Sequence, residues 1–452
     1  MFSKILIANR GEIAVRVIRA CKEMGIRTVA IYSEADRASL HVRLADEAIC
    51  VGGPKAEQSY LNIPAIISAA EITDVDGIHP GYGFLSQNAH FAEICDSCNI
   101  TFIGPSAQSI RLMGDKIAAK DLMRKSGIPI IPGSMTAIKN KDDALKTARR
   151  IGYPIIIKAA AGGGGRGMRV CHNDVRLISA LTTCQAEADA SFGSADVFVE
   201  KYLEAPRHIE FQILADQHNH TIHLGERDCT IQRRHQKLIE ESPSSAVDHK
   251  LRRKMGELAV RAAKACGYHS VGTVEFLLNS DGTFYFIEMN TRIQVEHPVT
   301  EMVTGLDLVK EQIRVAAGES LGIKQEDVAV EGWAIEARIN AEDPANDFIP
   351  CPGRITEFQI PGGRGVRVDT HVFTGYDVPP FYDSLLAKVI TTGTHREDAI
   401  RTMQRSLDEF FIEPICTTIP LHKQIFSDPT FWRGQLSTNY LERHLQQQGD
   451  GE

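Results

Sequence analysis

The sequence lacks several features that would assign it to a common class of protein. Its 452 residues contain no apolar run approaching the length of about 18 residues that suggests a membrane span, so no membrane association is expected. Lys and Arg total 50 against 58 Asp and Glu, and this net charge of −8 argues against nucleic-acid binding, which favours a basic surface. The opening residues MFSKILIANR have neither the apolar core nor the cleavage site of a signal peptide. We therefore expect a globular protein of two or three domains.

Cysteine provides little evidence of a disulfide framework or a zinc site. The ten cysteines are scattered along the chain, which is typical of reduced thiols, so a cytoplasmic location is expected. One pair, Cys95 and Cys98, has CxxC spacing, but no second pair completes a zinc site. We expect these two thiols to pack as small hydrophobic groups on a helix.

The first third of the chain alternates between strand-like and helix-like patterns. Residues 4–8 and 28–32 are apolar and strand-like, and the segment 11–24 between them has helical periodicity. This βαβ unit predicts a parallel sheet. The turn at residues 9–12 holds a single glycine rather than GxGxxG, so a dinucleotide-dependent protein is a weaker alternative.

A β-like run ending in Lys158 is followed by a loop with five glycines among residues 162–167. Such a loop exposes backbone N–H groups that suit phosphate oxygens. A Rossmann fold requires a helix directly after these glycines. Residues 169–171 are strand-like instead, so the Rossmann interpretation fails. The Lys-Ser/Thr pair of a P-loop is also missing. We expect a flap that closes over nucleotide phosphates, with a flexible surface loop as the alternative.

Basic residues gather between positions 227 and 237 of this acidic chain. They are Arg227, Arg233, Arg234 and Lys237, with His235 beside them. Taken alone, the cluster would be interpreted as a solvated loop. Beside a phosphate-binding loop, it predicts a site for anions.

The segment 284–298 alternates between polar and apolar residues, as a strand with one solvent-exposed face does. The polar face would carry Glu288, Asn290, Arg292, Gln294 and Glu296. Phe284 and Phe286 fall on the same face, which is unexpected among charges. The pattern predicts that these aromatics shield the charged side chains from water.

An Asp-Gly pair at residues 281–282 lies between two β-like runs and predicts a two-residue hairpin turn. Counting outward from this turn places Glu275 opposite Glu288. Like charges directly across a hairpin are destabilising, so a neutralising cation is expected. With Asn290 next on that face, the oxygen ligands suit Mg²⁺ or Mn²⁺. A carboxyl that keeps its proton, or a register slip of one residue, would also explain the pattern.

Arg292, Gln294 and Glu296 would continue this face beyond the cation, where they could hold a small oxyanion and remove its proton. A second alternating run at residues 331–340 places Arg338 on its polar side, together with Glu336 and Asn340. The local pattern leaves open whether Arg338 acts in chemistry or only as an ion-pair partner.

Several longer motifs closely resemble those of the biotin carboxylase family, the ATP-grasp component of acetyl-CoA carboxylase and related biotin-dependent carboxylases. They are ILIANRGEIAVRVIRA, HPGYGFLSQN, MGDK, IKAAAGGGGRGMRV, EKYLEAPRHIE, RDCTIQRRHQK and FIEMNTRIQVEHPVTE. The similarity extends along essentially the whole chain.

The resemblance implies a mixed α/β and α+β fold in three parts. A Rossmann-like pre-ATP-grasp domain would occupy residues 1–114. An ATP-grasp core would occupy residues 115–330, with a glycine-rich B-domain lid at about 132–203. The biotin carboxylase C-terminal domain would occupy residues 331–446, and residues 447–452 would form a polar tail.

The resemblance also implies site residues. ATP would be bound by Lys116, Lys158, Gly163, Gly164, Gly165, Met168, Glu200, Lys201, Leu203, His208, Gln232, His235 and Leu277. Two magnesium or manganese ions would be held by Glu275, Glu288 and Asn290. Bicarbonate and biotin would contact Tyr82, Lys237, Arg292, Gln294, Val295, Glu296 and Arg338. The catalytic groups among these would be Lys237, Arg292, Glu296 and Arg338.

The implied reaction is the ATP-, magnesium- and bicarbonate-dependent carboxylation of biotin through carboxyphosphate, which begins malonyl-CoA and fatty acid synthesis in acetyl-CoA carboxylase. A pyruvate or propionyl-CoA-type carboxylase, or another ATP-grasp ligase, is the alternative. The sequence contains no Met-Lys-Met biotinylation motif, so biotin is expected on a separate carrier protein. Carboxyltransferase subunits and a second copy of the chain are the other expected partners. One departure is Gln87, where the family usually has glutamate, so no charge-dependent role is assigned there.

Overall fold

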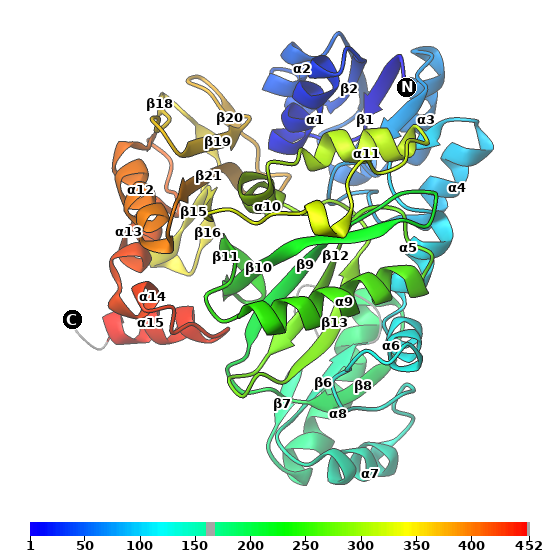
Figure 1. Ribbon diagram of the computed structural model, residues 1–452, viewed down its shortest axis with the longest axis vertical. Helices are drawn as coiled ribbons and strands as arrows, with labels where there is room; N and C mark the ends of the chain where they lie inside the picture. The colour runs from blue at the N-terminus through cyan, green and yellow to red at the C-terminus, as the bar shows by residue number, and fades with distance from the viewer. Residues whose placement is uncertain (160–167, 450–452) are drawn as a thin grey trace.

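The computed structural model describes residues 1–159 and 168–449. The N-terminal region forms a five-stranded parallel sheet, drawn in blue in Figure 1. Its strand order is β3-β2-β1-β4-β5. The strands are β1 (Lys4–Ile7), β2 (Arg27–Ser33), β3 (Glu47–Gly52), β4 (Gly77–His79) and β5 (Thr101–Phe102). The helices are α1 (Gly11–Glu23), α2 (Leu40–Leu44), α3 (Ile63–Ile72), α4 (Ala89–Ser97) and α5 (Ala107–Gly114). The predicted βαβ unit is confirmed.

Strand β1 is apolar from Ile5 onward because helices or other strands cover both of its faces. Ile5 and Ile7 pack into one buried cluster with α1, whereas Leu6 and Ala8 pack into another on the opposite face. Alternate burial on two faces is expected of a parallel strand inside an α/β layer. Cys95 lies in the second cluster with Cys98 packed against it, which confirms that these thiols act as small hydrophobic groups.

A small antiparallel sheet of order β7-β6-β8 lies at the lower end of the molecule in Figure 1. Its elements are α6 (Lys116–Lys125), α7 (Lys141–Ile151), β6 (Ile155–Ala159), β7 (Arg169–Cys171), α8 (Asp174–Phe192) and β8 (Val197–Lys201). Apolar side chains of β6 and β8 pack against α7 and α8 in one buried cluster.

The largest sheet has eight strands in the order β13-β12-β9-β10-β11-β14-β21-β19. The first part of this region contains β9 (Arg207–Ala215), β10 (Thr221–Arg233), β11 (Gln236–Ser242), α9 (His249–Ala265), β12 (Ser270–Leu278), β13 (Phe284–Asn290), α10 (His297–Thr304) and α11 (Leu308–Ala316). The pairing of β11 with β14 joins it to the C-terminal strands. The division expected near residue 330 therefore separates two stretches of sequence that share one sheet.

The C-terminal part is drawn in yellow to red in Figure 1. Its longer elements are β14 (Trp333–Asn340), β19 (Val366–Thr370), β21 (Leu385–Gly393), α12 (Arg396–Glu409), α13 (Ile419–Ser427), α14 (Pro429–Trp432) and α15 (Tyr440–Gly449). Short strands complete it, namely β15 (Glu342–Asp343), β16 (Ile349–Pro350), β17 (Gly353–Arg354), β18 (Glu357–Gln359), β20 (Asp377–Val378) and β22 (Phe411–Glu413). Helix α15 extends into the tail expected at 447–452, of which 450–452 lie outside the described residues.

The β12–β13 hairpin differs from its prediction near the turn. Leu278 pairs with Phe284, so residues 279–283 form a five-residue loop rather than a two-residue turn. A register shift follows, after which Glu275 pairs with Glu288 as predicted. The extra residue on β13, Ile287, forms a β-bulge that offsets the longer loop. The opposed carboxylates are thus confirmed, whereas the turn type is wrong.

The same bulge corrects the prediction that aromatic residues shield the charged face. Because an extra residue reverses the alternation of side chains, Phe284 and Phe286 point away from Glu288. Both pack against Phe276 with ring centroids 5.6 and 6.4 Å apart, and both belong to the buried cluster that also contains residues of α9. These aromatics are core residues. Strand β13 also ends at Asn290, so the later polar residues lie on an irregular segment before α10.

Among residues 1–159 and 168–449, no helix has the combination of length and apolar content that crossing a bilayer requires.

Candidate active site

A cavity of about 1070 Å³ gathers the predicted site residues. From the N-terminal region, α6 and the small sheet with its flanks, it is lined by Tyr82, Lys116, Lys158, Met168, Glu200, Lys201 and Leu203. From the large sheet and the segment after β13, it is lined by His208, Gln232, His235, Lys237, Glu275, Leu277, Glu288, Asn290, Arg292, Gln294, Val295, Glu296 and Arg338. Gly163, Gly164 and Gly165 lie outside the described residues. Every other predicted site residue is thus on the wall of one cavity.

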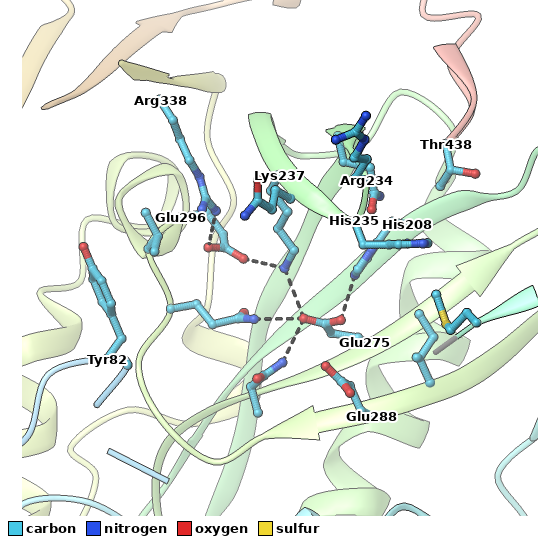
Figure 2. Close-up of a pocket in the computed structure, with 18 of the residues that line it drawn as sticks. Tyr82, His208, Arg234, His235, Lys237, Glu275, Glu288, Glu296, Arg338 and Thr438 are labelled. Atoms are coloured by element: carbon cyan, nitrogen blue, oxygen red, sulfur yellow. Dashed lines mark hydrogen bonds and ion pairs between the residues drawn. The ribbon is translucent and has the colours of Figure 1, made fainter. Parts of the chain in front are cut away.

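Glu275 of β12 and Glu288 of β13 face each other in the lower half of the close-up in Figure 2. The amides of Asn290 and Gln294 donate to Oε1 of Glu275 at 2.8 and 2.9 Å, and His208 lies 3.0 Å from Oε2. Burial alone would raise the pKa of Glu275, but the charges of Lys237 and His208 lower it below its usual value. Burial and the charge of Glu275 instead raise the pKa of Glu288. Glu288 is therefore the carboxylate of the pair whose charge is less well compensated.

Lys237 connects this pair to the next group of residues. Its ammonium donates to Glu210 at 2.5 Å, to Glu275 at 3.1 Å and to Glu296 at 2.6 Å. Burial would lower the pKa of Lys237, but these three carboxylates raise it well above its usual value. The lysine is therefore charged at neutral pH and connects the acidic pair to Glu296.

Glu296 lies between two cations at the start of α10, as the dashed lines in Figure 2 show. Oε1 accepts from Lys237, and Oε2 accepts from Nη2 of Arg338 at 2.9 Å. Although burial opposes ionisation, Lys237 and Arg338 lower the pKa of Glu296 well below its usual value. On the same edge of the Arg338 guanidinium, Nε donates to Oε1 of Glu240 at 2.6 Å, and Nη2 lies 2.5 Å from that oxygen. Glu296 is therefore an ionised carboxylate held by cations on both sides.

Arg292 reaches the same region from the irregular segment after β13. Its Nε donates to Oε1 of Gln87 at 2.8 Å, and its Nη2 donates to Oδ1 of Asn290 at 3.2 Å. Both partners are neutral amides. The guanidinium is thus oriented without being neutralised by these partners.

The opposite end of the cavity combines cations with an apolar slot. Lys158 lies 2.9 Å from Glu200, and Lys120, which no local sequence pattern indicates, also pairs with Glu200. Lys116 has a pKa lowered by burial. The amino group of Lys201 donates to backbone carbonyls of Gly152 and Tyr153 at 3.1 and 2.9 Å. The apolar lining is made by Ile131, Ile156, Met168, Leu203, Leu277 and Ile287. Such a slot beside lysines suits a flat ring attached to phosphates.

The donor set fits a hard divalent cation at Glu275 and Glu288. Among the described residues, two groups of three His, Cys, Asp or Glu side chains bring ligand atoms within 4.8 Å, and both contain Glu210. The oxygens of Glu210 already accept from Arg227 and Lys237, so the protein neutralises this centre itself. Burial and the charge of Glu275 raise the pKa of Glu288, and the neighbouring cations oppose this shift only in part. Carboxylate and amide oxygens are the ligands that Mg²⁺ and Mn²⁺ prefer.

The chain is similar to known proteins along nearly its whole length. Family models match residues 1–110 (biotin carboxylase, N-terminal domain), 115–324 (carbamoyl-phosphate synthase L chain, ATP binding domain) and 336–443 (biotin carboxylase C-terminal domain). The chain is 57% identical over 445 residues to biotin carboxylase 1 of Bacillus subtilis, covering 98% of this chain and 99% of that protein. The chain belongs to the biotin carboxylase family.

Two further relatives show how widely this family is used. A pyruvate carboxylase subunit of Methanothermobacter thermautotrophicus is 54% identical over 98% of this chain and 90% of its own length. The biotin carboxylase domain dimer of the Hydrogenobacter thermophilus 2-oxoglutarate carboxylase, solved with MgADP, ADP and bicarbonate, is 50% identical with a TM-score of 0.95 over 98% of each chain. The biotin carboxylase fold expected from the motifs is confirmed.

The structure corrects the predicted basic cluster at residues 227–237. Arg227 is fully buried and donates to Glu210 and Gln294 at 2.6 and 2.9 Å, so it braces the site from within the protein. Arg233 and Arg234 both pair with Asp347, at 2.6 and 3.2 Å. Of the five residues, Arg234, His235 and Lys237 line the cavity, whereas Arg227 and Arg233 do not.

Several residues of this biotin carboxylase site were not selected from the sequence. Glu210 and Glu240 are completely buried and hold Lys237 and Arg338. Glu12 accepts from the Tyr82 hydroxyl and lies 3.0 Å from the buried Lys388. The alternation of β11 could have indicated Glu240 as an inward-facing residue, but no local pattern reveals which cation it meets.

Proposed function

We propose that the cavity catalyses the carboxylation of biotin with ATP and bicarbonate. One observation carries the proposal. The opposed pair Glu275 and Glu288, suited to a divalent cation, is connected through Lys237 to Glu296 and Arg338. A cation bound by this pair would neutralise phosphate charge beside an ionised carboxylate and a fixed guanidinium.

The nucleotide would occupy the end of the cavity lined by the apolar slot and the lysines. Lys116 and Lys158 would contact phosphate oxygens, and the purine would lie against Met168 and Leu277. The remaining members of this proposed set are Glu200, Lys201, Leu203, His208, Gln232 and His235, with Gly163, Gly164 and Gly165 as the phosphate-covering loop. A magnesium ion held by Glu275, Glu288 and Asn290 would supply neutralisation of phosphate charge.

Bicarbonate would bind between Lys237, Arg292 and Glu296, with Gln294 and the backbone of Val295 beside it. The neighbouring cations Lys237 and Arg338 by themselves make Glu296 a weak base, because they lower its pKa. A bound anion competes for the same cations, which makes Glu296 more basic when it must act. Glu296 then takes the bicarbonate proton, a bicarbonate oxygen forms a bond to the γ-phosphorus, and ADP leaves. The product of this step is carboxyphosphate.

Biotin would enter on the side of Arg338 and Tyr82. Carboxyphosphate breaks down to CO₂ and phosphate, and phosphate removes the proton from the ureido nitrogen. That nitrogen then forms its bond to CO₂. Arg338 stabilises the negative charge that develops on the ureido oxygen, because its rigid guanidinium is already held in place by Glu240 and Glu296.

We infer that the protein works within acetyl-CoA carboxylase, with biotin on a carrier protein, carboxyltransferase subunits and a second copy of the chain as partners. The dimeric relative from Hydrogenobacter thermophilus supports the last of these. Two relatives belong to a pyruvate carboxylase and a 2-oxoglutarate carboxylase. A carboxylase that acts on an acceptor other than acetyl-CoA is therefore the second candidate. The proposed division is 1–114, 115–330 and 331–446, with the lid at about 132–203.

The test is ADP release by the purified protein with bicarbonate, Mg²⁺ and free biotin, each omitted in turn. We expect release to depend on bicarbonate and Mg²⁺ and to rise when biotin is added. Release that persists unchanged without bicarbonate and biotin would overturn the proposal. An ATP-grasp ligase that acts on an amine would ignore biotin, so the same assay separates that alternative.

A further inference from the structure

Two buried carboxyl groups outside the proposed reaction lie next to Arg338. Glu240 of β11 and Glu336 of β14 are directly paired across adjacent antiparallel strands, so their side chains share one face. Both residues are 0% exposed. Arg338 lies two residues beyond Glu336 on the same face of β14 and can be followed in Figure 2.

Most of the oxygen atoms in this pair have no protein partner. Oε1 of Glu240 accepts from Nε of Arg338 at 2.6 Å. Within the described part of the chain, Oε2 of Glu240 and both oxygens of Glu336 are buried without a hydrogen-bond partner. An unpartnered buried carboxylate is costly, and two of them side by side are more so.

The other cations near this pair form ion pairs with other groups. Lys388 on β21 lies 3.0 Å from Glu12 and donates to the carbonyl of Val295 at 2.9 Å. Lys237 on β11 is held by three carboxylates, of which Glu296 is one. Arg338 is therefore the one cation in direct contact with the pair among the described residues, and Glu296 shares it. In the described part of the chain, the two carboxyl groups of the pair therefore have one contacting cation, and Glu296 shares that cation with them.

The pKa values of both carboxyl groups shift in the direction that this shortage of positive charge favours. Burial raises the pKa of Glu240 to about 7, with Arg338 opposing the shift and Glu296 adding to it. Burial also raises the pKa of Glu336 well above its usual value, with Lys388 opposing and Glu240 adding to the shift. Both shifts favour at least one proton on the pair near neutral pH.

We propose that Glu240 is a positioning residue for Arg338 and that Glu240 and Glu336 share a single proton, an inference that rests on the proposed function. The proton lets Glu240 keep one charged oxygen on Nε of Arg338 while its other oxygen faces Glu336. Glu240 holds Nε and Nη2 along one edge of the guanidinium, and Glu296 accepts from the same Nη2. Arg338 is then presented to the ureido oxygen in one orientation.

Glu241 provides a matched control on the same strand. It faces the opposite side of β11, is 3% exposed, and accepts from Nε of Arg396 at 2.6 Å. It does not line the cavity. Glu241→Gln therefore weakens a buried carboxylate–arginine pair of the same kind without touching Arg338.

The experiment compares Glu240→Gln with Glu241→Gln in the full-length protein. Carboxybiotin formed from free biotin and bicarbonate-dependent ADP release without biotin are measured at saturating bicarbonate. We expect Glu240→Gln to lower carboxybiotin formation about tenfold to 100-fold, while ADP release without biotin changes less than about threefold. Glu241→Gln should lower neither by more than about threefold. Variants that behave alike in both assays would overturn the positioning role.

A second measurement needs no variant. Below a pH of about 7 the pair takes up a second proton, Glu240 loses its charge, and Arg338 loses an anchor. The carboxybiotin formed per ATP cleaved should therefore fall several-fold between pH 8 and pH 6 in the unaltered protein and in Glu241→Gln. In Glu240→Gln it should be low and flat over the same range. A flat ratio in the unaltered protein would overturn the shared proton, whereas absence of any biotin-stimulated turnover would instead overturn the proposed function.

Discussion

Replacing Glu296 by glutamine removes the proposed base and leaves a side chain of nearly the same shape. Glu296 accepts hydrogen bonds from Lys237 at 2.6 Å and from Arg338 at 2.9 Å. The amide retains one oxygen, so it can still accept one of the two. The perturbation therefore removes a proton acceptor and a negative charge without leaving a large hole.

The magnitude follows from these contacts. Losing one charge-assisted hydrogen bond should cost about 1.5–3 kcal/mol in unfolding free energy. Losing the base should lower bicarbonate-dependent ATP cleavage by about 100- to 10,000-fold, or about 2.7–5.5 kcal/mol in the activation barrier. Binding of Mg-nucleotide should change less than about threefold, because the lysines and the apolar slot of the proposed nucleotide site lie elsewhere in the cavity.

Glu301→Gln on α10 is the control for lost buried charge. Glu301 pairs with Arg16 at 2.9 Å and with Arg367 at 2.7 Å, and it does not line the cavity. Both variants are assayed by isothermal titration with Mg-nucleotide and by ADP release with bicarbonate. We expect similar losses of stability but a loss of turnover in Glu296→Gln alone. Turnover within tenfold of the unaltered protein, or a parallel loss of nucleotide affinity, would refute the assignment of Glu296 as the base.

Arg338→Lys should lower carboxybiotin formation about 100-fold while bicarbonate-dependent ATP cleavage persists, because one ammonium cannot replace the guanidinium fork; near-normal carboxylation would contradict this role. Glu288→Gln should raise the Mg²⁺ concentration needed for half-maximal ATP cleavage about tenfold or more, and an unchanged requirement would remove Glu288 from the cation site. Phe286→Ala should lower the free energy of urea unfolding by about 3–5 kcal/mol, since Phe286 is a core residue packed on Phe276; a loss below about 1 kcal/mol would contradict its placement.

Local patterns predicted the strands that carry the site but not how their registers are adjusted. The alternation at residues 284–290 identified β13, and counting outward from the predicted turn placed Glu275 opposite Glu288. The bulge at Ile287 is invisible to a strict period of two. For that reason Phe286 was assigned to the wrong face, while the opposition of the two carboxylates was right because the loop and the bulge offset each other.

Buried partners were harder to predict, because they depend on contacts distant in sequence. Arg227 is separated from its partners Glu210 and Gln294 by 17 and 67 residues, and a basic residue in a charged stretch gave no reason to place it in the core. The contact between Arg292 and Gln87 spans 205 residues. Such pairs arise when the N-terminal loop after β4 and the segment before α10 are brought together by the fold. Composition and motif spacing alone do not predict contacts between these two segments.

The central claim is that this cavity activates bicarbonate by transferring a phosphoryl group from ATP to one of its oxygens. Bicarbonate labelled with oxygen-18 tests it most directly, with mass spectrometry of the released phosphate and rapid sampling to limit exchange with water. We predict one labelled oxygen in each phosphate, because the oxygen that attacks the γ-phosphorus stays on phosphorus when carboxyphosphate breaks down. Phosphate that instead carries an oxygen from water would contradict the account.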